Sequence, residues 1–413
     1  MKQDSKIARI YPWIVVGLLW IVALLNYMDR QMLSTMREIM SYDIPELASA
    51  ERFGALMAIF LWIYGIVSPF GGAIADKLSR KWLIIASLMV WSAVTLLMGH
   101  CTTFNQVYML RALMGVSEAL YIPAGLSLIS DYHEGKSRSF AVGIHMTGIY
   151  IGQAAGGFGA NLGEMLTWQT TFQWFGIIGI AYGVILAFFL KDKKSDEPAA
   201  KIDAKQASIP MMKGFSMVLS NMAFWVILFF FASSSLPGWA TKNWLPTLYA
   251  GTLGIPMTQA GPISTITIAA SSFLGVMIGG PLSDRWVKKN IKGRIYTSAI
   301  GFTLTIPALI LLGLGHSLAA VIAAGVIFGV GFGMLDTNNM PILCQFVPKK
   351  LRATAYGIMN MIGVFAGALC TTVLGRWADK GQLGLAFAVL AILVAAALTL
   401  QLTVLKPTTD NME

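Results

Sequence analysis

Charged residues are scarce in this 413-residue chain, because Asp, Glu, Lys and Arg together make up 12% of it. This is about half of the share found in an average soluble domain. Apolar residues make up 56%, and the mean hydropathy is +0.67. The chain is long enough for two or three soluble domains but has too few polar residues to cover even one. The composition therefore excludes a soluble protein and predicts an integral membrane protein that contacts lipid.

Cysteine is scarce too, with three widely spaced residues at positions 101, 344 and 370, which exclude a disulfide scaffold. The sequence has no CxxC or HExxH run and no nucleophile spaced with a base, so we expect no metal, no cofactor other than protons, and no enzyme activity. The net charge of +10 could suggest nucleic acid. The basic residues, however, lie in short segments between apolar runs, so we expect no nucleic-acid partner.

Long apolar runs dominate the rest of the sequence. Twelve of them have about the 20 residues that a helix needs to cross a bilayer. They centre near residues 22, 64, 92, 119, 150, 180, 232, 272, 303, 328, 363 and 394. The first run continues into polar sequence without a small-residue cleavage site, so we interpret it as a helix rather than a signal peptide. The sequence predicts an all-α, multi-pass membrane protein with twelve transmembrane helices.

Basic residues give the orientation, because short cytoplasmic loops retain positive charge. The segments on one side hold most of the 30 lysines and arginines, whereas the other side holds only Arg37, Arg52, Arg376 and Lys380. Both termini are therefore expected in the cytoplasm, and the compact loops point to a bacterial inner membrane. The polar segment 191–213 is predicted to be a cytoplasmic linker between an N-terminal six-helix bundle (1–190) and a C-terminal one (214–413). We expect a monomer in the lipid bilayer.

One short motif occurs twice, six helices apart. The first copy is Gly72-Ala-Ile-Ala-Asp76-Lys77-Leu-Ser79-Arg80-Lys81, and the second is Gly280-Pro-Leu-Ser-Asp284-Arg285. Such an internal repeat is typical of transporters built from two parallel halves. The first copy resembles the G-x-x-x-D-R/K-x-G-R-K/R signature of the major facilitator superfamily, with Ser79 at the second glycine. The resemblance covers the whole chain and implies two pseudo-symmetric six-helix halves. It also implies that Asp76, Arg80, Asp284 and Arg285 gate the conformational change; alternatively, these charges only fix the topology.

Ionisable residues interrupt every third predicted span. Spans one, four, seven and ten contain Asp29 and Arg30, Arg111 and Glu118, Lys242, and Asp336, respectively. A charge at the bilayer centre costs at least about 2.5 kcal/mol, so each needs a partner, water or a function. A period of three helices predicts a central cavity lined by the first helix of each three-helix unit.

These residues and their polar neighbours are the candidate site. We expect Asp29 and Glu118 to carry protons, and two cations, Arg30 and Lys242, to bind an anionic substrate. The other predicted substrate contacts are Asn26, Tyr27, Tyr121, Tyr150, Trp239, Asn338, Asn339 and Asn360, and the accessory candidates are Arg111, His145, Gln153 and Asp336. Structural alternatives stay open, since buried amides often join helices, Arg111 could brace loops, and Lys242 could reach the interface.

The run Asn26-Tyr27-Met28-Asp29-Arg30 and the helix containing Arg111 and Glu118 resemble the anion:cation symporter branch of that superfamily. This branch implies that Arg30 contacts a carboxylate while Asp29 and Glu118 carry protons. We therefore expect proton-coupled symport of a small organic anion, a sugar acid such as a hexuronate or aldonate, in which protonation of Asp29 releases Arg30 to the substrate. The alternatives are a spinster-like lysolipid carrier, which shares these motifs, and an organophosphate antiporter.

Overall fold

The structure, a computed structural model, describes residues 2–133, 136–193, 216–348 and 351–407. Within these ranges every assigned element is a helix. The elements are α1 (Lys2–Ser41), η1 (Pro45–Ala48), α2 (Ala50–Lys77), α3 (Arg80–Met98), α4 (Phe104–Tyr132), α5 (Lys136–Gly156), α6 (Gly159–Leu166), α7 (Trp168–Phe189), α10 (Met222–Leu253), α11 (Met257–Val287), α12 (Gly293–Leu314), α13 (Leu318–Asp336), α14 (Asn339–Phe346), α15 (Arg352–Asp379) and α16 (Leu383–Val404).

The predicted twelve-helix membrane fold is confirmed. In the part of the chain that the structure describes, eleven helical segments are long and apolar enough to cross a membrane. The twelfth is α5, whose 21 residues span about 31 Å but include basic and amide side chains. Every predicted centre falls inside one of these helices. Large apolar side chains on the outer surface, such as Phe188, Met222 and Ile392, are exposed and form the surface expected to contact lipid.

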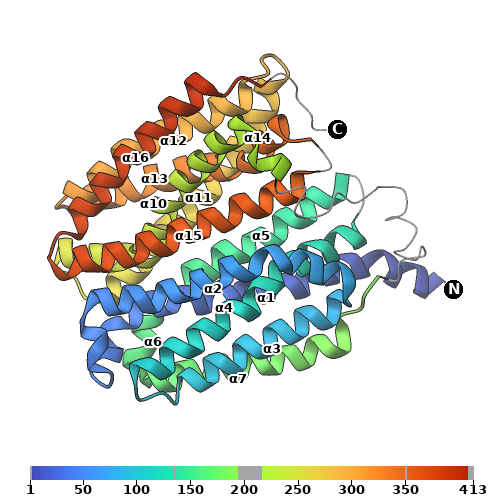
Figure 1. Cartoon of the computed structure of the whole chain (residues 1–413). Coiled ribbons are helices and arrows are strands. Elements are labelled where there is room, and N and C mark those ends of the chain that lie inside the picture. The colour runs from blue at the N-terminus through green and yellow to red at the C-terminus, as the bar shows by residue number, and fades with distance from the viewer. Residues whose placement is uncertain (1, 134–135, 194–215, 349–350, 408–413) are drawn as a thin grey trace.

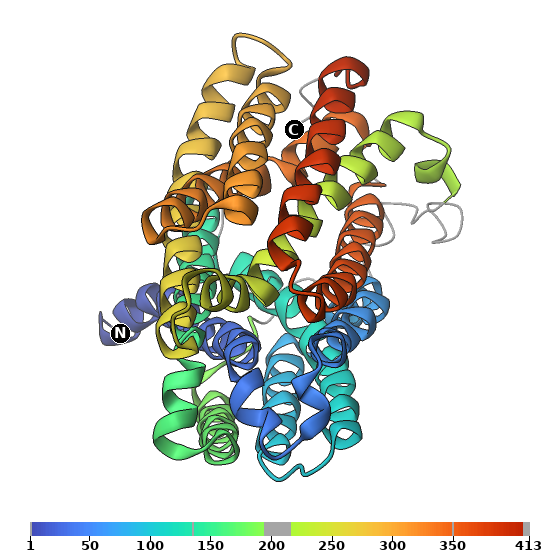
Figure 2. The same cartoon turned by 90° about the vertical axis from the view of Figure 1, so that its left-hand side faces the viewer.

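The helices form two bundles, α1 to α7 and α10 to α16, which lie one above the other in Figure 1 and are seen from the end of the molecule in Figure 2. The bundles meet most extensively along two helix pairs: α2 packs along α15, and α5 packs against α11. The predicted linker 191–213 lies largely outside the described residues.

Helix α1 extends beyond the predicted first span. Its 40 residues give a length of about 60 Å, twice the thickness of the hydrocarbon core. Asp29 and Arg30 therefore lie in the interior of a helix rather than near its end.

Glycines allow α5 to pack directly on α1. Gly148, Gly152 and Gly156 form the small-xxx-small stripe visible in the sequence. The carbonyl oxygens of α1 that face them have the same four-residue spacing, at Trp20, Leu24 and Met28. A Cβ atom on Gly148 would lie 2.7 Å from the first of these oxygens, and one on Gly156 would lie 2.6 Å from the last, both too close.

We expect Gly152→Val to lower the thermal unfolding midpoint, because its Cβ would overlap Leu24 O and overpacking costs about 1–3 kcal/mol. The matched control is Gly17→Val on α1, since nothing lies within 4 Å of a Cβ there. Thermal unfolding of the purified protein in detergent measures both variants. An equal loss of stability in the two would show that this helix contact is not tight.

Candidate functional site

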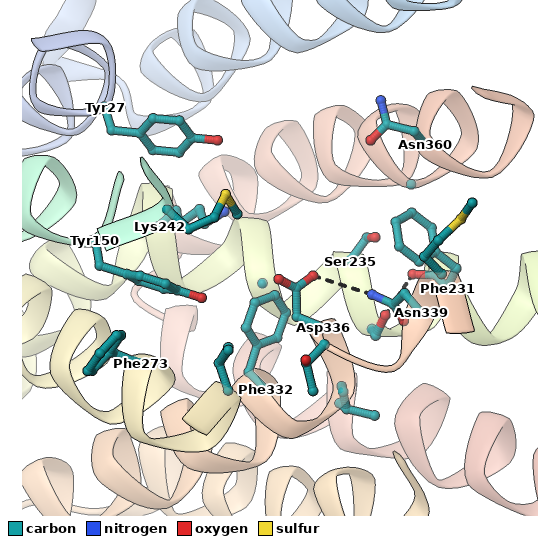
Figure 3. A pocket seen from close by; sticks show the side chains of 18 of the residues that line it. Tyr27, Tyr150, Phe231, Ser235, Lys242, Phe273, Phe332, Asp336, Asn339 and Asn360 are labelled. Atoms are coloured by element: carbon teal, nitrogen blue, oxygen red, sulfur yellow. Dashed lines mark hydrogen bonds between the residues drawn. The ribbon is translucent and has the colours of Figure 1, made fainter. Parts of the chain in front are cut away.

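A cavity of about 910 Å³ lies between the two bundles, and Figure 3 shows the side chains that line it. Its walls come from α1, α2 and α5 on one side and from α10, α11, α13, α14 and α15 on the other. The lining residues Phe140, Met340 and Tyr356 lie near helix ends on the side of the molecule where α1 begins. The size is in the range of small-molecule sites.

Arg30 of α1 is the principal cation on the N-terminal wall. Its Nε donates to a carboxylate oxygen of Glu118 on α4, which is completely buried behind it. The guanidinium lies 5.0 Å from the ring centre of Tyr27, 4.7 Å from that of Phe60 and 5.1 Å from that of Tyr64. Aromatic faces and an ion pair hold the arginine in one orientation. Its Nη2 is buried and has no hydrogen-bond partner among the described residues, whereas the side chain as a whole is 11% exposed and lines the cavity.

Arg111 shares this buried cluster but does not line the cavity. Its guanidinium stacks 4.8 Å from the centre of Phe60, on which Arg30 also stacks. One nitrogen contacts Met114 Sδ at 3.0 Å, and the residue is 2% exposed. The Arg111 charge interacts with Glu118 and Asp29. Arg111 therefore balances these carboxylates inside the bundle and does not brace loops.

Asp29 does not form the expected pair with Arg30. Its carboxylate accepts a hydrogen bond of 2.6 Å from the hydroxyl of Thr95 on α3, and it lines a separate small void with Trp91 and Phe175. The physical reason is helical geometry, since successive residues point about 100° apart, so Arg30 faces α4 and the cavity while Asp29 faces α3. The expected direct switch between Asp29 and Arg30 is therefore corrected: the partner of Arg30 is Glu118.

Among the described residues, the C-terminal wall carries one charge of each sign. Lys242 of α10 lies with its Nζ 4.8 Å from the Trp239 ring centre, and Asp336 ends α13. Figure 3 shows both side chains directed into the same space, where their charges interact. Asn339 donates to the Asp336 carboxylate at 3.3 Å.

The other predicted contacts fall into two groups. Tyr27, Tyr150, Trp239, Asn339 and Asn360 line the cavity, and Asn360 also donates to Ser68 Oγ of the other bundle at 3.1 Å. The residues that do not line the cavity are Asn26, Tyr121, Asn338, His145 and Gln153. Each of these five is buried in helix contacts. Tyr121 donates to Leu19 O, and Asn338 donates to Met334 O.

Several cavity residues were not identified from the sequence. Tyr64 lines the cavity and lies 5.1 Å from the Arg30 guanidinium, whereas Thr95, outside the cavity, donates a hydrogen bond to Asp29. Tyrosine and threonine are ordinary in membrane helices, so their types gave no signal. Phe60 and Tyr64 are four residues apart and therefore lie on one face of α2. This spacing was the only feature of the sequence that could have indicated a shared contact.

The predicted gating residues make contacts within their own bundles. Arg80 forms an ion pair with Asp131 at the end of α4, and Asp284 lies 3.5 Å from Arg294 at the start of α12. Arg285 is exposed, and the side chain of Asp76 lies outside the described residues. Ser79 begins α3 as an N-cap with φ of −57°, so the missing glycine requires no left-handed turn.

At the opposite end the bundles contact each other. Asp379, the last residue of α15, accepts hydrogen bonds from the main-chain nitrogens of Ala50 at 2.6 Å and Glu51 at 2.9 Å, so it caps α2 of the other bundle. Arg376 adds an ion pair of 2.7 Å to Glu51. On the second joining pair, Thr265 donates to Ala154 O at 3.1 Å. These contacts join the two bundles at this end.

Removing the cap should open this end. Asp379→Ala costs about 1 kcal/mol, a shift of roughly fivefold in favour of states where the bundles separate here. A cysteine replacing the buried Thr265, with the native cysteines changed to serine, should then react several times faster with a water-soluble maleimide. The control is Asp43→Ala, because Asp43 lies at the same end but accepts from Trp168 within its own bundle. No difference between the two variants would contradict the role of this contact.

Two helical bundles around a central cavity with charged walls are the architecture of a membrane transporter. Residues 19–371 match the Major Facilitator Superfamily, and the chain belongs to that family. It is a multi-pass membrane transporter and not an enzyme.

Its relatives agree with the resemblance read from its motifs. The chain is 25% identical to the probable galactarate/D-glucarate transporter GarP of Escherichia coli K12 over 88% of this chain and 87% of that protein. It is 23% identical to the D-galactonate transporter of E. coli O6:H1 over 89% of each chain. A crystal structure of a bacterial homologue of the human lysosomal transporter Spinster, inward-facing and unoccupied, superimposes with a TM-score of 0.80 at 19% identity and covers 95% of this chain and 96% of that one.

Proposed function

We propose that the protein is a proton-coupled symporter of a small sugar acid. The observation that carries this proposal is Arg30, a cation that Glu118 and aromatic rings hold on the cavity wall and whose side chain is 11% exposed. A planar guanidinium binds a carboxylate with two parallel hydrogen bonds. Relatives named as galactarate, glucarate and galactonate transporters support an acid that carries hydroxyl groups.

Proton coupling is assigned to Glu118 and Asp29. Glu118 shares Arg30 with the incoming carboxylate, so protonating Glu118 leaves the guanidinium free to hold the substrate. Asp29 lies behind the cavity and interacts with Arg111, which in turn interacts with Glu118. The buried cluster can therefore gain a proton without a direct contact between Asp29 and the substrate.

The orientation of the protein in the membrane is inferred from the distribution of its basic residues. Their distribution places both termini and the linker 191–213 in the cytoplasm. The compact loops favour a bacterial inner membrane, in which we propose that the protein is a monomer. In this orientation the cavity lies toward the cytoplasm and the contact of Asp379 with α2 closes the outer side. The gating motifs around Arg80 and Asp284 then have their bundle-to-bundle role in the opposite, outward-open state.

A ligand screen tests this function. Purified protein is heated with hexuronates, aldonates, aldarates and lysolipids at two pH values. We expect one hydroxylated acid to raise the unfolding midpoint, more strongly at the lower pH, since binding the folded state stabilises it. Loss of this stabilisation in Arg30→Ala would assign it to the cavity. No stabilisation by any acid would contradict the proposal.

One observation favours a second candidate, a lysolipid carrier. The inner part of the α5 and α11 wall is mainly apolar, with Phe140, Met146, Phe273 and Met277 facing the cavity. An acyl chain could lie there while a headgroup contacts Arg30. Stabilisation by lysolipids alone would select this function, whereas Lys242, Asp336 and Asn360 on the same cavity support a hydrophilic ligand.

A further inference from the structure

The cavity walls hold few charges. Among the described residues that line the cavity, the basic and acidic ones are Arg30, Lys242 and Asp336. Arg30 is paired with Glu118 behind the wall, and Lys242 faces Asp336 across the space shown in Figure 3. Neither cation is therefore an uncompensated charge.

The buried groups around the cavity are balanced as well. Arg111 is the third cation, and the carboxylates of Asp29 and Glu118 accompany it inside the bundle. When every group is ionised, the positive charges of Arg30, Lys242 and Arg111 equal the negative charges of the three carboxylates, which are those of Asp29, Glu118 and Asp336. One bound proton leaves a single positive charge, which one carboxylate of a substrate neutralises. A second substrate carboxylate has no cation left to balance it, and an unbalanced charge in a membrane interior is costly.

Asp336 lies where it can contact the end of a ligand opposite the end that Arg30 binds. Arg30 belongs to α1 of one bundle and Asp336 to α13 of the other, so they lie on opposite walls. Asn339 holds the Asp336 carboxylate at 3.3 Å, and Tyr150 points its hydroxyl toward it. A carboxylate only accepts hydrogen bonds, so it suits the hydroxyl groups of a sugar acid and repels a second carboxylate.

We infer that Asp336 is a specificity-determining residue that selects hydroxylated monocarboxylates over dicarboxylates of the same length. The substrate carboxylate binds at Arg30, and the hydroxyl at the other end of the substrate donates to Asp336, whose charge Lys242 already balances. The inference rests on the proposed function and narrows its substrate class: an aldonate fits, and the corresponding aldarate does not. The opposite arrangement, with a second carboxylate on Lys242, would place it beside Asp336 and is disfavoured by the same repulsion.

The experiment compares galactonate with galactarate, which share one six-carbon skeleton and differ by the second carboxylate. Their dissociation constants are measured by calorimetry on the purified full-length protein in detergent. We expect the wild type to bind galactonate at least about tenfold more tightly, because juxtaposed like charges strongly disfavour a partner. Asp336→Asn keeps the size of the side chain and should bring the two constants to within about threefold of each other. Glu46→Gln is the control, since it removes an exposed carboxylate in η1 outside the cavity and should keep the wild-type ratio.

The outcomes separate the inference from the proposed function. Binding of neither acid, nor of any other sugar acid, by the wild type overturns the proposed function and this inference with it. Equal binding of both acids by the wild type, or a wild-type ratio in Asp336→Asn, overturns the inference alone. If Asp336→Asn does not fold, the wild-type ratio still decides, and Asp336→Glu, which keeps the charge, must retain the preference for galactonate.

Discussion

Replacing Arg30 with lysine is expected to weaken binding of the acid substrate by about ten- to hundredfold. An ammonium group is a point charge and cannot reproduce the two parallel hydrogen bonds of a guanidinium to a carboxylate, and a charged hydrogen bond contributes about 1.5–3 kcal/mol. Lysine also lacks the planar guanidinium whose carbon lies 4.7 Å from the ring centre of Phe60 and 5.1 Å from that of Tyr64. Equilibrium binding of the acid found in the ligand screen measures the change.

Arg111→Lys is the matched control for this prediction. Arg111 stacks on the same Phe60 ring but is 2% exposed and does not line the cavity. The Arg111→Lys variant should keep the substrate affinity within a few-fold of the wild type, because Arg111 contacts no ligand. An unchanged affinity in Arg30→Lys, or an equal loss in both variants, would contradict the carboxylate site at Arg30.

Asp29→Asn is expected to abolish accumulation of the substrate while exchange of labelled for unlabelled substrate continues. An asparagine oxygen can still accept the hydrogen bond from Thr95, so the local structure is kept and only the exchangeable proton is lost. With one proton carried per anion, a gradient of one pH unit concentrates the substrate about tenfold in the wild type. The variant should reach only equal concentrations on both sides.

Glu118→Gln should change substrate binding as well as accumulation, and comparing it with Asp29→Asn tests the separate roles given to the two carboxylates. Its substitution removes the ion partner of a buried arginine, so substrate binding as well as coupling should change. Both variants are assayed for uptake and for exchange in the same vesicles. Full pH-driven accumulation in Asp29→Asn would remove this residue from the proton path.

The fold followed from the sequence because its signals are local. Apolar length sets each span, and the repeated glycine and aspartate motif at residues 72–81 and 280–285 marks the two halves. The short helices α6 and α14 and the extension of α1 to Ser41 were not predicted. They depend on contacts with other helices, such as those of α6 with α1 and α7, and not on the apolar length of their own segments.

The site was predicted in part. The charges of every third span indicated the cavity, and Arg30, Lys242 and Asp336 line it. Spacing alone could not tell that Asp29 points to Thr95 instead of Arg30, because neighbouring residues of a helix face different helices. The amides of Asn26 and Asn338 looked like ligand contacts but are buried between helices, since a sequence gives residue types without the rotation of each helix.

Uptake into proteoliposomes tests the central claim most directly. Wild-type protein is reconstituted into vesicles, an acidic exterior is imposed, and entry of a labelled aldonate is followed with and without a protonophore. The account predicts accumulation above the external concentration that the protonophore abolishes and that Arg30→Ala lacks. Uptake that only equilibrates, or that ignores the pH gradient, would contradict proton-coupled transport of a sugar acid through this cavity.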